Sequence, residues 1–207
     1  MMPLKNKPVY IIGNGEHARV ISALLSVTTK SEDHFFISKT SLESASDKNI
    51  ITEHEFLNNI NPKNCNLFMG IGHSHDNKSR QNVFKSYKEK NFSFTIATHN
   101  EAYVDSSVKL GEGCQILANA TVINDTSIGE NALINTSASI DHDCEIGKNV
   151  HIAPGAIICG GVTIENDVFV GPGSTIVRGI KIGKGSIIGA GSVITKDITE
   201  YSKIIKS

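Results

Sequence analysis

The chain has 207 residues, of which 39% are hydrophobic and 20% are charged, and its formal net charge at pH 7 is −1. A nearly neutral chain with no basic run offers no surface for nucleic acid or for an anionic membrane, so neither is expected as a partner. No apolar stretch approaches the roughly 18 residues of a transmembrane helix, and the first residues lack the apolar core of a signal peptide. We therefore expect a soluble, cytoplasmic protein.

The first hundred residues alternate short apolar runs with helical stretches. The predicted strands are the runs at 8–12, 34–37, 50–51, 66–71 and 92–96. The predicted helices lie at 18–27, 53–59 and 76–90. Strands that alternate with helices indicate a small parallel sheet of the doubly wound type. We therefore predict a Rossmann-like α/β domain over residues 1–97.

A glycine turn joins the first predicted strand to the first predicted helix and reads GNGEHA from Gly13 to Ala18. Such a turn and the helix N-terminus behind it present backbone N–H groups to an anion. The pattern superficially fits a dinucleotide fingerprint, but Ser38 and Lys39 follow the second strand, where a dinucleotide site expects an acid. The domain is also small for two mononucleotide halves. A nucleotide diphosphate-linked sugar fits better than NAD, and the remaining alternative is a turn that only packs helix on strand.

Neither the cysteines nor a histidine pair predicts a metal site. The four cysteines, Cys65, Cys114, Cys144 and Cys159, have no metal-ligand spacing, which favours a reduced chain without disulfides. His73 and His75 lie in a polar loop without a third ligand, so we expect no metal there.

From residue 98 onward the sequence repeats every six residues, a period that fits neither a helix nor a plain strand. Hexapeptide repeats are typical of a parallel β-helix, in which three six-residue faces make one triangular coil. We expect the aliphatic residue of each repeat to point inward and the small residue two places earlier to occupy the tight corner. The aliphatic positions are Val104, Leu110, Ile116, Val122, Ile128, Ile134, Ile140, Ile146, Ile152, Ile158, Ile164, Val170, Ile176, Ile182, Ile188 and Ile194.

Two histidines lie within the repeats, and His142 is the stronger catalytic candidate. It comes two places after the inward Ile140, so we expect it at a coil corner facing outward. Gly160 follows one full coil later and should stack on it at the strand spacing of about 4.8 Å. An imidazole beside a bare peptide N–H can transfer an acyl group, because the imidazole removes a proton and the N–H binds the oxyanion. A solvated surface histidine is the alternative.

The spacing leaves open which acid accompanies His142. Asp143, Asp141 and Asp125 all lie near this corner, and any of them would favour the imidazolium and raise the pKa of the histidine. His151 precedes the inward Ile152 and points outward from a different face, so we expect it to approach His142 only across a subunit boundary.

With these residues in place, the chain resembles the bacterial sugar acetyltransferases of the left-handed β-helix superfamily, particularly those acting on nucleotide-linked 4-amino-4,6-dideoxy sugars. Sialic acid O-acetyltransferase-like proteins share the layout. The likeness rests on IIGNGEHARV, on the turn Gly70-Ile71-Gly72 with Arg80 after it, and on NTSASIDHDCEIGKNVHIAPGA, which is the specific part. A γ-carbonic anhydrase, also built of hexapeptides, needs three zinc histidines, whereas the repeats here hold two.

The resemblance implies an acetyl-CoA-dependent homotrimer that acetylates the sugar 4-amino group by direct attack, for an O-antigen, a capsule or a protein glycan. It implies His142 as general base, Asp143 as its acid and Asn135 near the substrate amine. It places the acetyl-CoA against His151, Gly160, Gly161, Pro172 and Ala190. It places the nucleotide-linked amino sugar against Gly13, Asn14, Gly15 and His17. An O-acetyltransferase and a non-catalytic scaffold remain alternatives, and UDP, dTDP and GDP remain open as the nucleotide, because Ser38-Lys39 stands where many relatives carry an acid.

Overall fold

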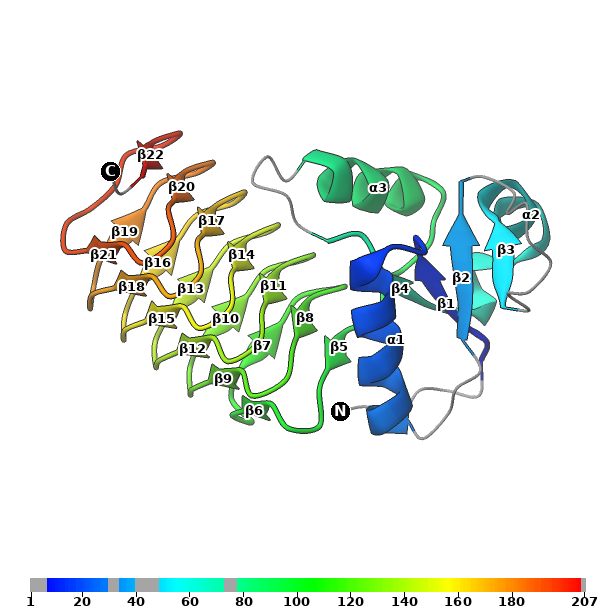
Figure 1. Ribbon diagram of the computed structural model, residues 1–207, viewed down its shortest axis with the longest axis horizontal. Coiled ribbons are helices and arrows are strands. Elements are labelled where there is room, and N and C mark those ends of the chain that lie inside the picture. The colour runs from blue at the N-terminus through cyan, green and yellow to red at the C-terminus, as the bar shows by residue number, and fades with distance from the viewer. Residues whose placement is uncertain (1–6, 30–33, 40–48, 73–77, 206–207) are drawn as a thin grey trace. The chain divides into compact units, whose positions relative to one another are not determined.

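The computed structural model describes residues 7–29, 34–39, 49–72 and 78–205 (Figure 1). The chain divides into two compact units, Met1–Ala97 and Thr98–Ser207, and each is described by itself.

A four-stranded parallel sheet forms the centre of the first unit and confirms the Rossmann-like prediction. Its strands are β1 (Val9–Ile12), β2 (His34–Ser38), β3 (Ile50–Thr52) and β4 (Asn66–Met69), in the order β3-β2-β1-β4. Ile12 pairs with Ile37 on one side and with Met69 on the other, so the carboxyl ends of three strands lie level. In open parallel sheets this edge is where ligands bind.

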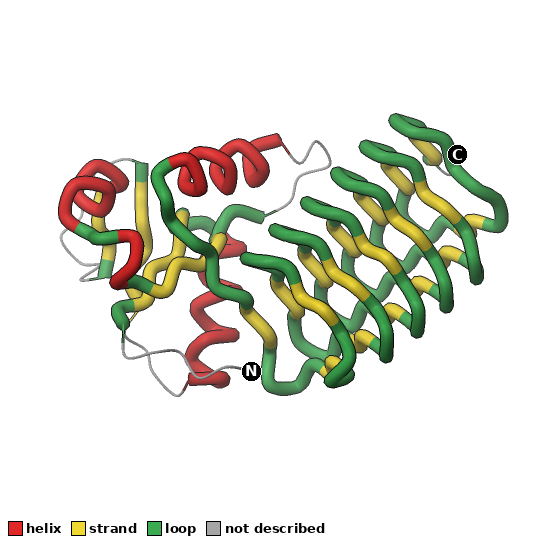
Figure 2. Tube along the Cα trace, turned by 180° about the vertical axis from the view of Figure 1, so that it is seen from behind, coloured by secondary structure: helices red, strands yellow, loops and turns green. Residues whose placement is uncertain are grey.

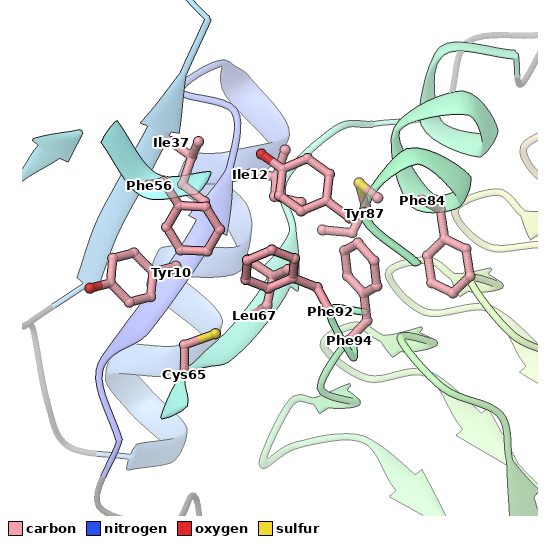
Figure 3. Packing of buried hydrophobic residues seen from close by; sticks show 11 residues of the cluster. Tyr10, Ile12, Ile37, Phe56, Cys65, Leu67, Phe84, Tyr87, Phe92 and Phe94 are labelled. Atoms are coloured by element: carbon pink, nitrogen blue, oxygen red, sulfur yellow. The ribbon is translucent and has the colours of Figure 1, made fainter. Parts of the chain in front are cut away.

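Helices cover both faces of this sheet. The helix α1 (Glu16–Thr29) lies on the face of Ile11, because a Cβ on Gly70 would touch both Ile11 and Ala18. The helices α2 (Glu53–Asn59) and α3 (Lys78–Glu89) lie on the other face, and a 3₁₀ turn spans Pro62–Asn64. Figure 3 shows the aromatic cluster between that face and these helices, with the Phe84 and Phe94 rings stacked at 4.5 Å.

The strand predicted at 92–96 is wrong. Only a single bridge joins Phe94 to Leu67, with Thr95 N–H donating to the Leu67 carbonyl at 2.8 Å. Phe92 and Phe94 are buried in the aromatic cluster, so their burial rather than strand pairing explains the apolar alternation. The predicted helix at 76–90 is α3, although its first two residues lie outside the described ranges.

The second unit is the predicted left-handed parallel β-helix, seen from behind in Figure 2. Its three sheets are each built of two-residue strands. The seven-stranded sheet holds β5 (Ala97–Thr98), β8 (Gln115–Ile116), β11 (Leu133–Ile134), β14 (His151–Ile152), β17 (Phe169–Val170), β20 (Ile187–Ile188) and β22 (Lys203–Ile204). The six-stranded sheet holds β6 (Tyr103–Val104), β9 (Thr121–Val122), β12 (Ser139–Ile140), β15 (Ile157–Ile158), β18 (Thr175–Ile176) and β21 (Val193–Ile194). The five-stranded sheet holds β7 (Lys109–Leu110), β10 (Ser127–Ile128), β13 (Glu145–Ile146), β16 (Thr163–Ile164) and β19 (Lys181–Ile182).

The winding is regular through the region that holds His142. Ile140 pairs with Val122 below and with Ile158 above, one coil of the hexapeptide period in each direction. Only the last coil departs from the period, because Ile188 pairs with Ile204 and Ile182 bridges to Ile198, each two residues short of a full coil.

The tight corner of each repeat is made by a different residue from the one the sequence indicates. The small residue of each repeat points inward, and Cys114, Ala138 and Cys144 are fully buried. The residue immediately before it turns the chain, with φ near +60°, a conformation that Gly, Asn and Asp adopt at least cost. These left-handed positions are Gly113, Asn119, Asp125, Asn131, Ser137, Asp143, Asn149, Gly155, Gly161, Asp167, Gly173, Gly179, Gly185, Gly191 and Tyr201.

Candidate active site

The corner between β12 and β13 carries the candidate catalytic histidine. The His142 carbonyl accepts the N–H of Gly161 at 2.9 Å, which stacks the next corner directly on this one. A Cβ on Gly160 would lie 2.7 Å from His142 Nε2 and 2.8 Å from Cε1. The imidazole therefore covers the Gly160 backbone, as the spacing predicts, and any side chain at residue 160 would displace it.

Asp143 is the acid that accompanies the imidazole. Its Oδ2 lies 2.7 Å from His142 Nδ1. Asp141 instead accepts the backbone N–H of His142 at 2.9 Å, and Asp125 accepts from the side chain of Asn124 at 2.8 Å. Because the carboxylate takes the hydrogen on Nδ1, the lone pair is left on Nε2, the nitrogen that faces Gly160.

Gly160 supplies the predicted bare amide. The residue is buried, and its N–H donates no hydrogen bond to any described residue. Buried backbone N–H groups are nearly always paired, so an unpaired one beside a histidine is a candidate donor to a ligand oxygen. Gly161 cannot share this role through its backbone, because its own N–H is bonded to the His142 carbonyl.

Cys144 lies inside the coil beneath this corner. Its Sγ is 3.3 Å from the Cys159 carbonyl and 3.6 Å from the His142 carbonyl. Burial raises the pKa of this thiol, which keeps it protonated and unreactive at neutral pH. Among the side chains of this corner, the His142 imidazole therefore remains the candidate for acid–base chemistry.

Asn135 and His151 form a separate pair at a different corner. Asn135 Nδ2 lies 3.1 Å from His151 Nε2, and the His151 ring meets Phe169 edge-on at 5.2 Å. His151 precedes the inward Ile152 and lies on the outer face of its sheet, as the repeat predicts, but it is only 6% exposed. Within one chain the structure does not bring this pair to His142.

Pro172 and Ala190 lie on later coils of the corner that carries Asn135, because residues 136, 154, 172 and 190 stack in one column. The Gly191 N–H donates to the Pro172 carbonyl at 2.8 Å, which aligns the two corners that carry these residues. Both residues are exposed, and both follow strands of the seven-stranded sheet rather than the sheet that precedes His142. They form an open corner and do not form a pocket with His142 within one chain.

The glycine turn of the first unit is shaped by close backbone contacts. Gly13 has φ of +92°, and its N–H donates to the Ile37 carbonyl at 2.8 Å. A Cβ on Gly70 would lie 2.4 Å from the Ile12 carbonyl, so only glycine fits there. The buried Arg80 holds the neighbouring turn through a 2.7 Å bond from Nη1 to the Ile71 carbonyl.

The other predicted nucleotide-binding residues surround this turn. Asn14 and Gly15 are exposed, and a Cβ on Gly15 would meet nothing within 4 Å. His17 is half-buried and packs beside Gly72, whose Cβ would lie 3.2 Å from that of His17. The turn thus presents open backbone at the start of α1.

A cavity of about 240 Å³, here called the strand-end pocket, opens beside the turn at the carboxyl ends of β1 and β2. Its walls are Ile12, Ile37, Ile71 and Val83, and its polar side chains include Glu53 and Tyr87. Neither Glu53 nor Tyr87 is predicted as a site residue from the sequence. The capping box of Thr52 and Glu55 marks the start of α2 and could have located Glu53, but no local pattern points Tyr87 toward a pocket.

Three further features of the described residues bear on function. None of the described helices is long and apolar enough to cross a bilayer. No three His, Cys, Asp or Glu side chains in the described ranges gather as metal ligands would, and His73 and His75 lie outside those ranges. A hollow of about 580 Å³ beside Glu165 and Lys181 is larger than the strand-end pocket, but it is open and away from His142.

Known proteins share both units. Residues 8–87 match the family model for the PglD N-terminal domain, and residues 125–160 and 161–196 each match that for the bacterial transferase hexapeptide (six repeats). PerB from Caulobacter crescentus, solved in complex with CoA and GDP-perosamine, is 30% identical, with 95% of this chain and 92% of that chain covered and a TM-score of 0.80. The chain belongs to the sugar N-acetyltransferases of the hexapeptide acyltransferase superfamily.

Other solved relatives agree with this assignment. The acetyltransferase domain of PglB from Neisseria gonorrhoeae FA1090, in complex with acetyl coenzyme A, is 26% identical with 96% of each chain covered and a TM-score of 0.87. WeeI from Acinetobacter baumannii AYE, at 20% identity, 96% coverage of each chain and a TM-score of 0.86, shares the fold. A comparison with curated proteins finds no significant match. The acetyltransferase uses acetyl-CoA as its acetyl donor.

Proposed function

We propose that this acetyltransferase acts on the 4-amino group of a nucleotide-linked 4-amino-4,6-dideoxy sugar, with His142 as the general base. The observation that carries the proposal is the His142–Asp143 pair stacked on the unpaired amide of Gly160. The complex of PerB with CoA and GDP-perosamine supports an acceptor of this class, because perosamine carries an amine at its fourth carbon. The product would serve the synthesis of a surface glycan in the cytoplasm.

The geometry suits direct transfer. The sugar nitrogen attacks the thioester carbonyl of acetyl-CoA while its proton passes to His142 Nε2, and Asp143 stabilises the imidazolium that forms. The new C–N bond leaves a tetrahedral oxyanion, which the Gly160 N–H binds. The C–S bond then breaks, and the CoA thiolate takes the proton from the imidazolium.

A homotrimer would complete this site. Asn135 and His151 lie at a different corner from His142. Pro172 and Ala190 are exposed on later coils of the corner that carries Asn135. In a trimer of prisms, the corner of one copy faces that of the next, so these residues would bind the acetyl group and the pantetheine arm beside a neighbouring His142. The Gly13 turn of the first unit would hold the diphosphate at the start of α1.

A substrate panel tests the proposal. CoA thiol release is measured with acetyl-CoA and UDP-, dTDP- and GDP-linked 4-amino sugars, and with their 4-hydroxy counterparts. Release with at least one amino sugar and with none of the hydroxy sugars is the expected result. Release with hydroxy sugars alone would identify an O-acetyltransferase, and no release with any of them would contradict the proposal.

A further inference from the structure

The strand-end pocket has the walls of a site for a flat ring. Ile12 ends β1 and Ile37 lies one residue before the end of the neighbouring β2, and both line the pocket together with Ile71 and Val83. Branched aliphatic side chains lining a cavity of about 240 Å³ suit the faces of a planar base. The glycine turn at the mouth lies where a diphosphate attached to that base would reach the start of α1.

The polar groups inside the pocket are an acid and a phenol. Glu53 is half-buried in the first turn of α2, and the capping box of Thr52 and Glu55 fixes where that turn begins. Tyr87 is 1% exposed, and its hydroxyl lies near the Glu53 carboxylate without forming a hydrogen bond of standard geometry. Burial and then the charge of Glu53 raise the pKa of Tyr87, so the phenol stays protonated and the carboxylate lies close to it.

A carboxylate can only accept hydrogen bonds, so it selects a ligand edge that carries donors. Among the five common bases, guanine alone has two adjacent donors, N1–H and the N2 amino group, on one edge. Uracil and thymine place a carbonyl on each side of a single N–H. Adenine and cytosine place a ring acceptor beside their amino group. Each of these four would set an acceptor against Glu53, which is repulsive.

Lys39 supplies the complementary charge. It is exposed at the rim of the pocket, directly after β2. Guanine carries its O6 acceptor next to N1. When its N1–H and N2 donors face Glu53, O6 can therefore face the Lys39 ammonium at the rim.

We infer that the strand-end pocket binds guanine, with Glu53 accepting from N1–H and N2 and with Lys39 donating to O6. The acceptor of the reaction is then a GDP-linked amino sugar. This inference rests on the proposed function, which it narrows to one nucleotide.

Nucleotide binding to the whole protein tests the inference. Isothermal titration with GDP, UDP, dTDP and ADP should give GDP the lowest Kd, by at least about 10-fold. Equal constants for GDP, UDP and ADP, which share both ribose hydroxyls, would show that Glu53 contacts the ribose and not the base, and would overturn the inference. Tighter binding of UDP, dTDP or ADP would overturn it as well.

The variant Glu53→Gln sharpens the test. A glutamine amide can accept from the N–H of uracil and donate to its carbonyl, so GDP should bind about 10- to 100-fold more weakly while UDP binds more tightly. Glu55→Gln is the matched control in the same helix, because its side chain bonds to Thr52 and glutamine also completes a capping box. The control should keep GDP affinity within about twofold. An unchanged nucleotide preference in Glu53→Gln would overturn the assignment of this residue.

Acetyl-transfer assays distinguish failure of the guanine inference from failure of the proposed function. Transfer to UDP-linked but not to GDP-linked amino sugars would refute guanine and leave the proposed function standing. Selective GDP binding without transfer to any amino sugar would refute the proposed function and leave the guanine site standing.

Discussion

The conformation of single residues decides which side chains meet at the catalytic corner. Three acids lie near His142, and the sequence alone does not choose among them. Asp143 takes the left-handed corner position, with φ of +56°, and its carboxylate meets Nδ1. The carboxylate of Asp141, one residue before the histidine, accepts a hydrogen bond from the backbone N–H of His142 instead. The choice depends on side-chain hydrogen bonds, and the six-residue period carries no information about these.

Replacement of His142 by alanine should lower kcat by roughly 10²- to 10⁴-fold, because the proton acceptor is lost. The side chain is 37% exposed and outside the coil, so the melting temperature should stay unchanged. CoA release and thermal unfolding measure the two effects. Asn124→Ala, one coil below at the same corner position, is the matched control and should retain kcat. An unaltered kcat in His142→Ala would rule out the histidine as the base.

Replacement of Gly160 by alanine should also impair catalysis while the backbone stays folded. The new methyl group would lie 2.7 Å from His142 Nε2 and must push the imidazole away, so we expect kcat to fall about 10²-fold or more. Gly179→Asn, one coil beyond Gly161, is the control, because asparagine tolerates its φ of +73° and nothing lies within 4 Å of its Cβ position. Similar activity in both variants would show that contact with residue 160 does not position the histidine.

At the scale of the element, the left-handed corner column explains what the repeat demands beyond its aliphatic residue. Thirteen of the fifteen left-handed corner positions are Gly, Asn or Asp, and Ser137 and Tyr201 are the exceptions. A serine with φ of +57° has a strained backbone, which costs about 1 kcal/mol. The corner column was visible in the sequence as recurring Gly, Asn and Asp, so this part of the fold could have been predicted more fully.

Ser137→Gly should therefore stabilise the protein by roughly 0.5–1 kcal/mol, because glycine relieves the strain at that corner. Ser139→Gly is the opposing control, two residues later in β12, where glycine weakens a strand and should lower stability. Chemical denaturation of both variants gives the comparison. Destabilisation by Ser137→Gly would mean that the serine hydroxyl contributes more than the backbone loses.

Prediction from the sequence succeeded where a feature repeats and failed where it depends on distant packing. The six-residue period placed His142 against Gly160 because eighteen residues make one coil. The segment at 92–96 looked like a strand because its phenylalanines alternate, yet burial against Phe84 and Tyr87 produces the same pattern. Glu53 and Tyr87 come from two helices that meet only in the folded domain, so no local pattern brings them together.

At the scale of the whole molecule, the separation of the two histidine corners makes a prediction about assembly. If His142 and His151 of different copies share one site, two inactive variants can restore each other. His142→Ala and His151→Ala chains, co-expressed with different tags and purified as mixed oligomers, should recover roughly a quarter of the wild-type activity, the share of random interfaces with both residues intact. Each variant alone is the control. No recovery in verified mixed oligomers would place the site within one chain.

The shortened last coil has a consequence for the solubility of the prism. A stack of flat parallel strands offers unpaired N–H and C=O groups at its end, and another molecule could add to them and start a fibre. Here Ile198 and Ile204 pair with the coil below after two residues fewer than a regular coil, and the Tyr201 ring packs against Gly185. A second molecule with a regular hexapeptide coil could not pair with these strands in register, so end-to-end addition is disfavoured.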